Sequence, residues 1–424
     1  MLRSADPIYR LEPAPTGDPH AGIADLLDHD RVESVFQPIV DLATGATVAY
    51  EALARGPVGA LHSPLAMFAA ARAAGRLDEL DRSCRAAALR GASRRGIARP
   101  LTVFVNVEPE TLDGTLPCDA PADGSLRVML EITERELAAR PAELLRTVEH
   151  VRSRGWGVAL DDVGVEAASL AFMPLLRPDV IKLDLSLVQG VPSPAVAQVM
   201  HAVNAYAESS GALVLAEGIE NTRHLEVALA LGATLGQGWH FGRPSAEPAV
   251  PPGPVGLPVP IRSPGVGAPG RVSPFACLPP TTVLRRAPKR LLIELSKHLE
   301  REAVRIGSTS VIASTFQLRE HFTPATRVRY RELAETTGFV AAIGEGLAPE
   351  PLPGVRGATL GPDDPVLGEW DVAVLSPHFA TALLARDLGE DGPDLERTFE
   401  YALTYDRDTV VAAMHQLLLR VAPH

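Results

Sequence analysis

The chain has 424 residues, of which 46% are hydrophobic and 22% are charged, with a formal net charge of -12 at pH 7. This length predicts two domains rather than one core, the composition excludes a disordered chain, and the acidic balance argues against a nucleic acid polymer as partner. The three cysteines are too scattered for a metal-binding pair or a disulfide framework, and no apolar run approaches the roughly 18 residues of a membrane span, so we expect a cytoplasmic protein with no membrane partner.

The first 30 residues are rich in Pro and Asp, and we expect a flexible N-terminal segment there. From residue 31 to residue 245, short apolar runs alternate with amphipathic stretches. The expected strands are Val35–Asp41, Thr47–Leu53, Thr102–Val107, Arg127–Ile132, Gly157–Asp161, Val180–Asp184, Leu213–Ala216 and Gly238–Phe241. The expected helices are Pro64–Gly75, Asp78–Ser93, Pro141–Arg154, Ser169–Leu176, Pro194–Ser209 and Thr222–Leu231. About eight strands alternating with helices predict an α/β fold of the (β/α)₈ TIM-like barrel type.

Residues 246–289 are rich in Pro and Gly, which predicts a semi-rigid linker. We interpret the basic stretch Arg285–Arg290 as its solvated end rather than as a binding site. Regular patterns resume over residues 290–424 and predict a second, smaller α/β domain. Its expected helices are Leu291–Arg305, Pro324–Thr337, Phe379–Asp387 and Asp408–Val421, and its expected strands are Val311–Ser314, Phe339–Ile343 and Asp371–Ser376.

Polar side chains recur at or just after the expected strands of the first domain. They are Glu51, Asn106, Glu131, Asp161, Asp162, Lys182, Glu217 and Gln237. Because the ends of parallel barrel strands meet at one face, we expect these side chains to gather in one cup. Any single carboxylate at a strand end is more often a helix cap or a surface charge, but so many within apolar strands favour a shared site.

Several carboxylates in one cup would repel each other unless cations neutralise them. Oxygen ligands without His or Cys suit Mg²⁺ or Mn²⁺ better than Zn²⁺. The adjacent Asp161 and Asp162 can serve two metal ions, and a two-metal site suits attack on a phosphodiester. Lys182 lies within an apolar strand, where orienting an attacking water would explain its presence.

The motifs around these residues resemble the EAL domain. They are Glu51-Ala-Leu-Ala-Arg55, Phe36-Gln-Pro-Ile-Val40, Val105-Asn-Val107, Leu130-Glu-Ile-Thr-Glu134, Asp161-Asp-Val-Gly164, Ile181-Lys-Leu-Asp184, Ala216-Glu-Gly-Ile-Glu220 and Gly236-Gln-Gly-Trp-His-Phe-Gly-Arg-Pro244. This resemblance implies a bacterial cyclic-di-GMP phosphodiesterase domain over residues 31–245, a hydrolase of signal transduction that uses Mg²⁺ or Mn²⁺ and releases linear pGpG.

The resemblance also implies a role for each residue. The metal ligands would be Glu51, Asn106, Glu131, Asp161 and Asp162. The catalytic residues would be Lys182 and Glu217, which position the attacking water, together with Glu51. The substrate cyclic-di-GMP would contact Gln37, Arg55 and Gln237. Glu134 and Glu220 would support the site from behind these residues.

The loop after the fifth expected strand departs from the family pattern. Family members usually have Asp-Asp-Phe-Gly-Thr-Gly-Tyr-Ser-Ser-Leu, whereas this chain has Asp161-Asp-Val-Gly-Val-Glu-Ala-Ala-Ser-Leu170. A Gly is replaced at Glu166, which removes access to positive φ. The resemblance implies that this loop links a homodimer interface to metal and substrate binding. We therefore expect the altered residues 163–168 to weaken activity.

The C-terminal residues 290–424 resemble the DICT sensory domain. The strings that carry this resemblance are Arg327-Val-Arg-Tyr-Arg-Glu-Leu-Ala334, Glu369-Trp-Asp-Val-Ala-Val-Leu-Ser-Pro377, Ala385-Arg-Asp387 and Arg397-Thr-Phe-Glu-Tyr-Ala-Leu-Thr-Tyr-Asp406. By analogy we expect this domain to regulate the barrel through an unknown signal or protein partner. We expect Arg386-Asp387 and Tyr405-Asp406-Arg407 to form ion pairs and caps that hold the fold rather than a binding cluster.

Three interpretations remain open for the whole chain. The first is an active phosphodiesterase regulated by its C-terminal domain, and retention of the metal positions favours it. The second is an impaired barrel that acts as a cyclic-di-GMP receptor or an interaction scaffold, which the altered loop supports. The third, a barrel enzyme for another phosphate ester, is disfavoured by the sequence contexts of Gln37 and Arg55.

Overall fold

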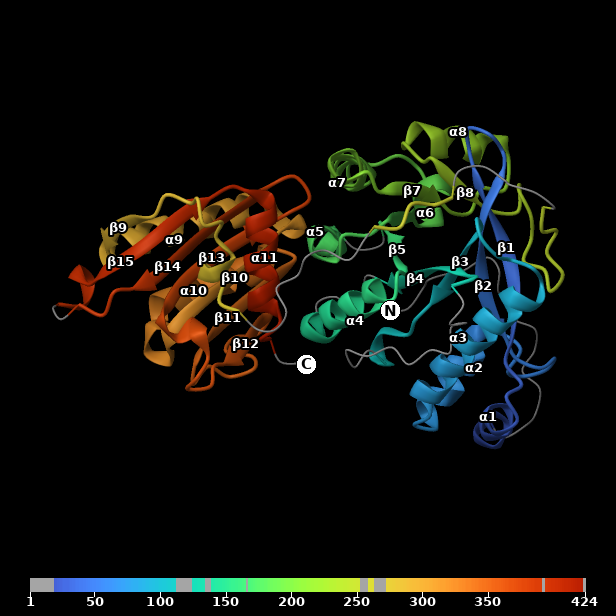
Figure 1. Ribbon diagram of the computed structural model, residues 1–424, viewed down its shortest axis with the longest axis horizontal. Helices are drawn as coiled ribbons and strands as arrows, with labels where there is room; N and C mark the ends of the chain where they lie inside the picture. The colour runs from blue at the N-terminus through green and yellow to red at the C-terminus, as the bar shows by residue number, and fades with distance from the viewer. Residues whose placement is uncertain are drawn as a thin grey trace. The chain divides into compact units, whose positions relative to one another are not determined.

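The structure is a computed structural model and describes residues 19–111, 124–133, 139–164, 167–251, 258–262, 272–390 and 393–421. Its strands form two sheets, a closed eight-stranded barrel and a seven-stranded open sheet (Figure 1). None of the helices within these ranges is long and apolar enough to cross a membrane. Residues Glu134, Val165 and Glu166, on which part of the sequence prediction rests, lie outside the described residues.

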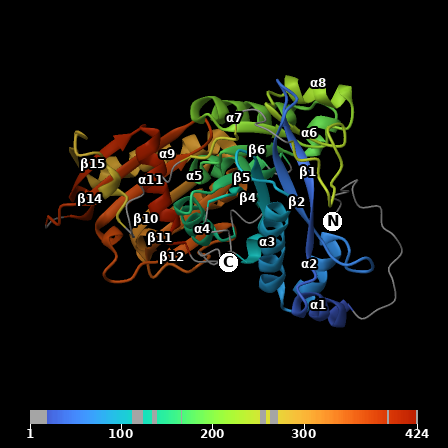
Figure 2. The same ribbon diagram turned by 45° about the vertical axis from the view of Figure 1, so that its right-hand side comes forward.

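The closed barrel confirms the predicted TIM-like fold. Its strands follow chain order and are β1 (Glu33–Asp41), β2 (Thr47–Arg55), β3 (Thr102–Asn106), β4 (Arg127–Thr133), β5 (Gly157–Val163), β6 (Val180–Leu183), β7 (Leu213–Ala216) and β8 (Leu235–Gln237). The helices of this region are α1 (Pro19–Asp28), α2 (Pro64–Ala73), α3 (Leu77–Arg94), α4 (Pro141–Ser153), α5 (Met173–Leu176), α6 (Leu185–Gln189), α7 (Pro194–Ser210) and α8 (Thr222–Ala230). Both ribbon views show α3 running beside β1 and β2 (Figures 1 and 2).

The first barrel strand runs against its neighbours. β1 is antiparallel to β2 and to β8, whereas the β2–β3 and β3–β4 pairs are parallel. The cause is local, because only Leu42–Ala46 separates β1 from β2 and Gly45 has a φ of 69°. Such a short turn permits a hairpin, while a parallel pair needs a crossover of about a dozen residues.

Helices α2, α7 and α8 begin where their sequences provide caps. The side chains of Ser63, Ser193 and Asn221 accept hydrogen bonds from the backbone N–H groups three residues later. Proline follows directly at the first position of α2 and of α7, where its missing N–H costs nothing. These signals explain why the starts of these three helices were predictable.

The second sheet has the order β12-β11-β10-β13-β14-β15-β9. Its strands are β9 (Arg285–Pro288), β10 (Val311–Leu318), β11 (Phe339–Glu345), β12 (Val355–Thr359), β13 (Glu369–Leu375), β14 (Ala380–Asp387) and β15 (Thr398–Thr404). Its helices are α9 (Lys289–Ile306), α10 (Pro324–Thr336) and α11 (Arg407–Leu418). Val372 and Val374 of β13 join one apolar core with α9 and α10, while α11 packs on the opposite face.

Short 3₁₀ helices complete the two regions. They are η1 (Pro109–Thr111), η3 (Ala167–Phe172), η4 (Phe275–Cys277), η5 (Gly307–Thr309), η6 (Arg319–His321), η7 (Pro365–Gly368) and η8 (Asp394–Glu396).

Residues 379–387 form a strand, and the helix prediction there was wrong. Their Ala and Leu content favours a helix intrinsically. β14 instead pairs along its length with β13 and with β15, and a backbone bond from Ser376 N to Phe379 O (2.7 Å) closes the turn before it. Burial between two neighbouring strands therefore overrides the local propensity.

Three further expectations differ from the structure. The last barrel strand ends at Gln237, because Gly238 has a φ of 152° and its carbonyl accepts turn bonds from the residues that follow. The segment expected to be flexible contains helix α1, whose Ile23 and Leu26 are buried. The expected solvated stretch 285–290 instead supplies edge strand β9 and the buried, ion-paired Lys289.

The expected structural roles in the C-terminal domain are confirmed. Arg386 pairs with Glu400 across strands β14 and β15 at 2.6 Å, and Asp387 pairs with Arg397. Asp406 caps α11 by accepting the N–H of Thr409 at 3.0 Å.

Candidate active site

A hydrogen-bonded group of polar side chains lies on strands β1, β2, β3 and β8. The Gln237 amide donates to Glu51 Oε2 at 2.6 Å and to Gln37 Oε1 at 3.3 Å, and the Asn106 amide donates to Glu51 Oε1 at 3.2 Å. Gln37 lies directly opposite Glu51 in the β1–β2 hairpin, because the strands pair antiparallel. Gln37, Glu51 and Gln237 are each buried. The structure thus brings four of the predicted residues together.

Glu131 is next to this group and is fully buried. It stands opposite Asn106 in the β3–β4 pair, and its backbone carbonyl accepts a bond from Val107 N at 3.3 Å. A carboxylate with no exposed surface is costly to ionise unless a cation or several donors compensate it. Its position is therefore consistent with the predicted ligand role.

A bulge places Asp161 and Asp162 together at the end of β5. Leu160 pairs with Ile181 and Val163 pairs with Leu183, so the two aspartates stand against the single residue Lys182 of β6. Side chains on a regular strand alternate between faces, but a bulge with one residue in a special conformation redirects them. Asp162 has a φ of 54°, which Asp tolerates better than most residues.

Lys182 forms an ion pair with Asp161. Its Nζ lies 2.8 Å from Asp161 Oδ1, and only 1% of the lysine is exposed. The backbone N–H of Asp162 donates to the same oxygen, Asp161 Oδ1, at 3.0 Å. The bulge thus holds a buried cation against one of two adjacent carboxylates.

Glu217 follows β7 in a segment that is held against β8. Ile219 N donates to Gln237 O at 3.0 Å, and Ile219 O accepts from His240 N at 2.9 Å. This close approach requires a glycine at position 238, since an added Cβ would lie 2.1 Å from Ile219 O. The sequence pattern did not identify this backbone contact, although Gly238 lies within a recognised motif.

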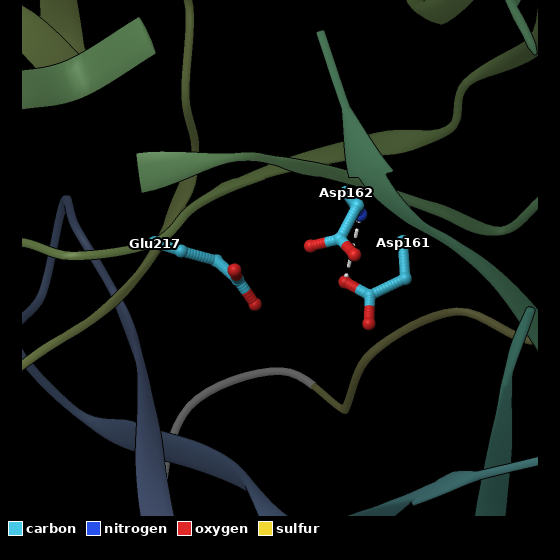
Figure 3. Close-up of side chains that lie close together, drawn as sticks. All are labelled: Asp161, Asp162 and Glu217. Atoms are coloured by element: carbon cyan, nitrogen blue, oxygen red, sulfur yellow. Dashed lines mark hydrogen bonds between the residues drawn. The ribbon is translucent and has the colours of Figure 1, made fainter. Parts of the chain in front are cut away.

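The carboxylates of Asp161, Asp162 and Glu217 gather at one place (Figure 3). Their ligand oxygens lie within 4.8 Å of one another, and the side chain of Glu217 points toward the two aspartates. Three carboxylates without His or Cys match the preference of Mg²⁺ and Mn²⁺ for oxygen. The donor set therefore fits a hard divalent cation.

The remaining predicted residues lie at the edges. Arg55 ends β2 and is half-buried, and its guanidinium donates to Ala54 O at 2.7 Å. Glu220 is exposed, with its backbone N–H directed at His224 Nδ1 (3.4 Å). The substrate role of Arg55 and the supporting roles of Glu134 and Glu220 stay predictions.

Comparison with known proteins decides the family. Residues 21–244, just over half of the chain, match the EAL domain. The chain belongs to the EAL family. Residues 278–388 match the DICT domain, which is described as a sensory domain in diguanylate cyclases and two-component systems. This EAL chain therefore also carries a DICT domain.

Curated relatives of this EAL domain include two proteins of Pseudomonas aeruginosa. The chain is 31% identical over 233 residues to the cyclic di-GMP phosphodiesterase NbdA, a match covering 51% of this chain and 29% of NbdA. It is 30% identical over 235 residues to the cyclic di-GMP phosphodiesterase RocR, covering 52% of this chain and 59% of RocR. The chain thus spans less than two thirds of either relative.

Among solved structures, the EAL chain is similar to Klebsiella pneumoniae BlrP1 in its manganese/cy-diGMP complex at pH 9.0. The sequence identity is 28%, the TM-score is 0.45, and the match covers 51% of this chain and 56% of that chain.

Proposed function

We propose that this chain hydrolyses cyclic-di-GMP to linear pGpG in a reaction that depends on Mg²⁺ or Mn²⁺. The observation that carries the proposal is the group of Asp161, Asp162 and Glu217, whose ligand oxygens lie within 4.8 Å of one another. Membership of the EAL family and relatives named cyclic di-GMP phosphodiesterases support the choice of substrate.

The residues divide into those that would hold the metal and those that would act beside it. The ligands would be Glu51, Asn106, Glu131, Asp161 and Asp162. Bound Mg²⁺ or Mn²⁺ supplies charge neutralisation for the phosphodiester and acidity to water. Glu217, close to both aspartates, would orient the attacking water and accept its proton.

Lys182 has two tasks in this arrangement. Its ammonium, 2.8 Å from Asp161, fixes the orientation of that carboxylate. As a buried cation it would also stabilise negative charge that develops on the phosphate in the transition state. The amide network of Gln37 and Gln237 would hold Glu51 in place and contact the substrate.

The proposal is tested by replacing Glu217 with Gln, which keeps the shape of the side chain and removes its charge. Glu226→Gln is the matched control, because Glu226 is exposed on helix α8. We expect Glu217→Gln to lower kcat by about 100-fold or more, as loss of a positioned base does, and Glu226→Gln to leave it unchanged. Near-native turnover by Glu217→Gln would refute the assigned role.

Two measurements distinguish an active enzyme from a receptor that binds cyclic-di-GMP without hydrolysing it. Calorimetry with cyclic-di-GMP in Ca²⁺ measures binding, and chromatography of the products in Mn²⁺ measures hydrolysis. Binding without any release of pGpG would replace the proposed activity with a receptor function, in keeping with the altered sequence at residues 163–168.

A further inference from the structure

The segment after β3 determines where the Asn106 side chain lies. Asn106 is the last residue of β3 and its amide donates to Glu51 at 3.2 Å. Beyond it the sheet provides one bond, from Val107 N to Glu131 O at 3.3 Å. The chain then turns into η1 (Pro109–Thr111). The orientation of Asn106 therefore depends on what holds residues 107–111.

A single buried carboxylate on helix α3 holds both ends of this turn. Asp81 is 1% exposed, and its Oδ1 accepts the N–H of Glu108 at 3.0 Å. Its Oδ2 accepts the hydroxyl of Thr111 at 2.7 Å and a guanidinium bond from the buried Arg85 one helical turn later. The Thr111 hydroxyl also contacts Glu108 O at 2.8 Å.

Helix α3 is a rigid support for this carboxylate. It has 18 residues, lies along β1, β2 and β3, and buries Ala88 and Leu89, while its Leu80 joins an apolar cluster with helices α1 and α2. A surface contact from helix α2 also reaches the turn, since Arg72 Nη2 lies 3.0 Å from Glu110 Oε1. Arg72 is 48% exposed, and its guanidinium also contacts Glu110 Oε2 at 3.2 Å and Glu108 Oε1 at 3.4 Å, so it supports the turn from the solvent side. Asp81 is a buried group that holds both ends of the turn.

We propose that Asp81 is a positioning residue for the metal site, acting through Glu108 and Thr111 to hold Asn106 toward Glu51. The proposal rests on the proposed function in that Asn106 is taken as a metal ligand. The hydrogen bonds described for the Asp81 carboxylate come from Glu108, Thr111 and Arg85. None of them comes from Asn106. The effect of Asp81 on the site is mechanical, through the backbone of residues 107–111.

The first variant is Thr111→Val, which removes one donor to Asp81 without placing an unpaired charge in the interior. Thr102→Val is the matched control, because Thr102 lies on the same strand as Asn106 and its buried hydroxyl bonds to no described residue. Two readouts on the full chain are compared: hydrogen exchange of the peptide containing residues 104–111, and calorimetric binding of Mn²⁺ alone.

We expect Thr111→Val to weaken Mn²⁺ binding by about 5- to 10-fold, the factor for one net hydrogen bond, and to speed exchange of residues 107–111 by a similar factor. Thr102→Val should change neither readout. Unchanged exchange and unchanged Mn²⁺ affinity in Thr111→Val would overturn the proposal. If the native chain took up no Mn²⁺, the proposed function would fail, while the exchange comparison would still decide whether the turn is held through Asp81.

A double-mutant cycle sharpens the assignment. Asp81→Asn keeps the side-chain shape but lowers its strength as an acceptor. In that background Thr111→Val should add less than a further 2-fold to the loss of Mn²⁺ affinity, because both changes remove the same contact. Fully multiplicative losses would show that Thr111 acts independently of Asp81 and would contradict the proposal.

Discussion

Replacing Gly238 with Ala should disturb both the stability of the barrel and the placement of Gln237 and Glu217. Gly238 has a φ of 152°, and an added Cβ would lie 2.1 Å from Ile219 O and 2.4 Å from Ile219 N. Backbone conformations reserved for glycine cost about 1–3 kcal/mol for other residues. The overlap with backbone atoms requires a further shift, so we expect a total loss of about 2–4 kcal/mol.

Gly211→Ala separates the cost of a positive φ from the cost of overlap with Ile219. Gly211 also has a positive φ, 73°, at the end of α7, but an added Cβ there meets no atom within 4 Å. Thermal unfolding should show a decrease in Tm of roughly 5–15 °C for Gly238→Ala and a clearly smaller decrease for Gly211→Ala. Equal decreases for the two variants would refute the argument that contact with Ile219 makes glycine necessary at position 238.

Three other changes test separate parts of the account. Lys182→Met should lower kcat by about 100-fold or more, as loss of a charge-stabilising group does, while calorimetry still detects Mn²⁺ binding, and a near-native kcat would remove Lys182 from the mechanism. Burial raises the pKa of both Glu369 and Asp371, so the folded domain retains protons that the unfolded chain releases. The free energy of unfolding should therefore fall as the pH rises above about 4, the pKa of these side chains in the unfolded chain. Asp371→Asn should reduce that fall in urea denaturation measured from pH 5 to pH 8, and an unchanged pH dependence would contradict the direction of the shift. Truncation after Pro244 should alter turnover or the mass measured by light scattering if the DICT domain regulates the barrel, and identical values for both chains would argue against regulation in the absence of its signal.

The barrel and much of its site could be predicted because the determining signals are local. Glu131 and Asp161 are acids inside strands that are otherwise apolar, and the helix starts at Ser63 and Ser193 have capping side chains followed by proline. Parallel strands then bring distant residues to one edge, as the bond between Asn106 and Glu51 illustrates. These features require no knowledge of tertiary contacts.

The features that the sequence did not predict depend on pairing between distant segments. β14 has the composition of a helix and becomes a strand because β13 and β15 flank it. The bulge that turns Asp161 and Asp162 to the same place is set by the register with β6. The contact of Gly238 with Ile219 and the bond from Asp81 to Glu108 likewise join residues that no local pattern relates.

The central claim is metal-dependent hydrolysis of cyclic-di-GMP at the carboxylate site, and product analysis of the purified full chain tests it most directly. The chain is incubated with cyclic-di-GMP in Mn²⁺, in Mg²⁺, in Ca²⁺ and in excess chelator, and the nucleotides are separated by chromatography. We predict linear pGpG in Mn²⁺ or Mg²⁺, none in chelator, and inhibition by Ca²⁺, whose looser coordination suits such a site poorly. Glu51→Ala should release no product under any condition. Undiminished hydrolysis in chelator, or native rates from Glu51→Ala, would contradict the account.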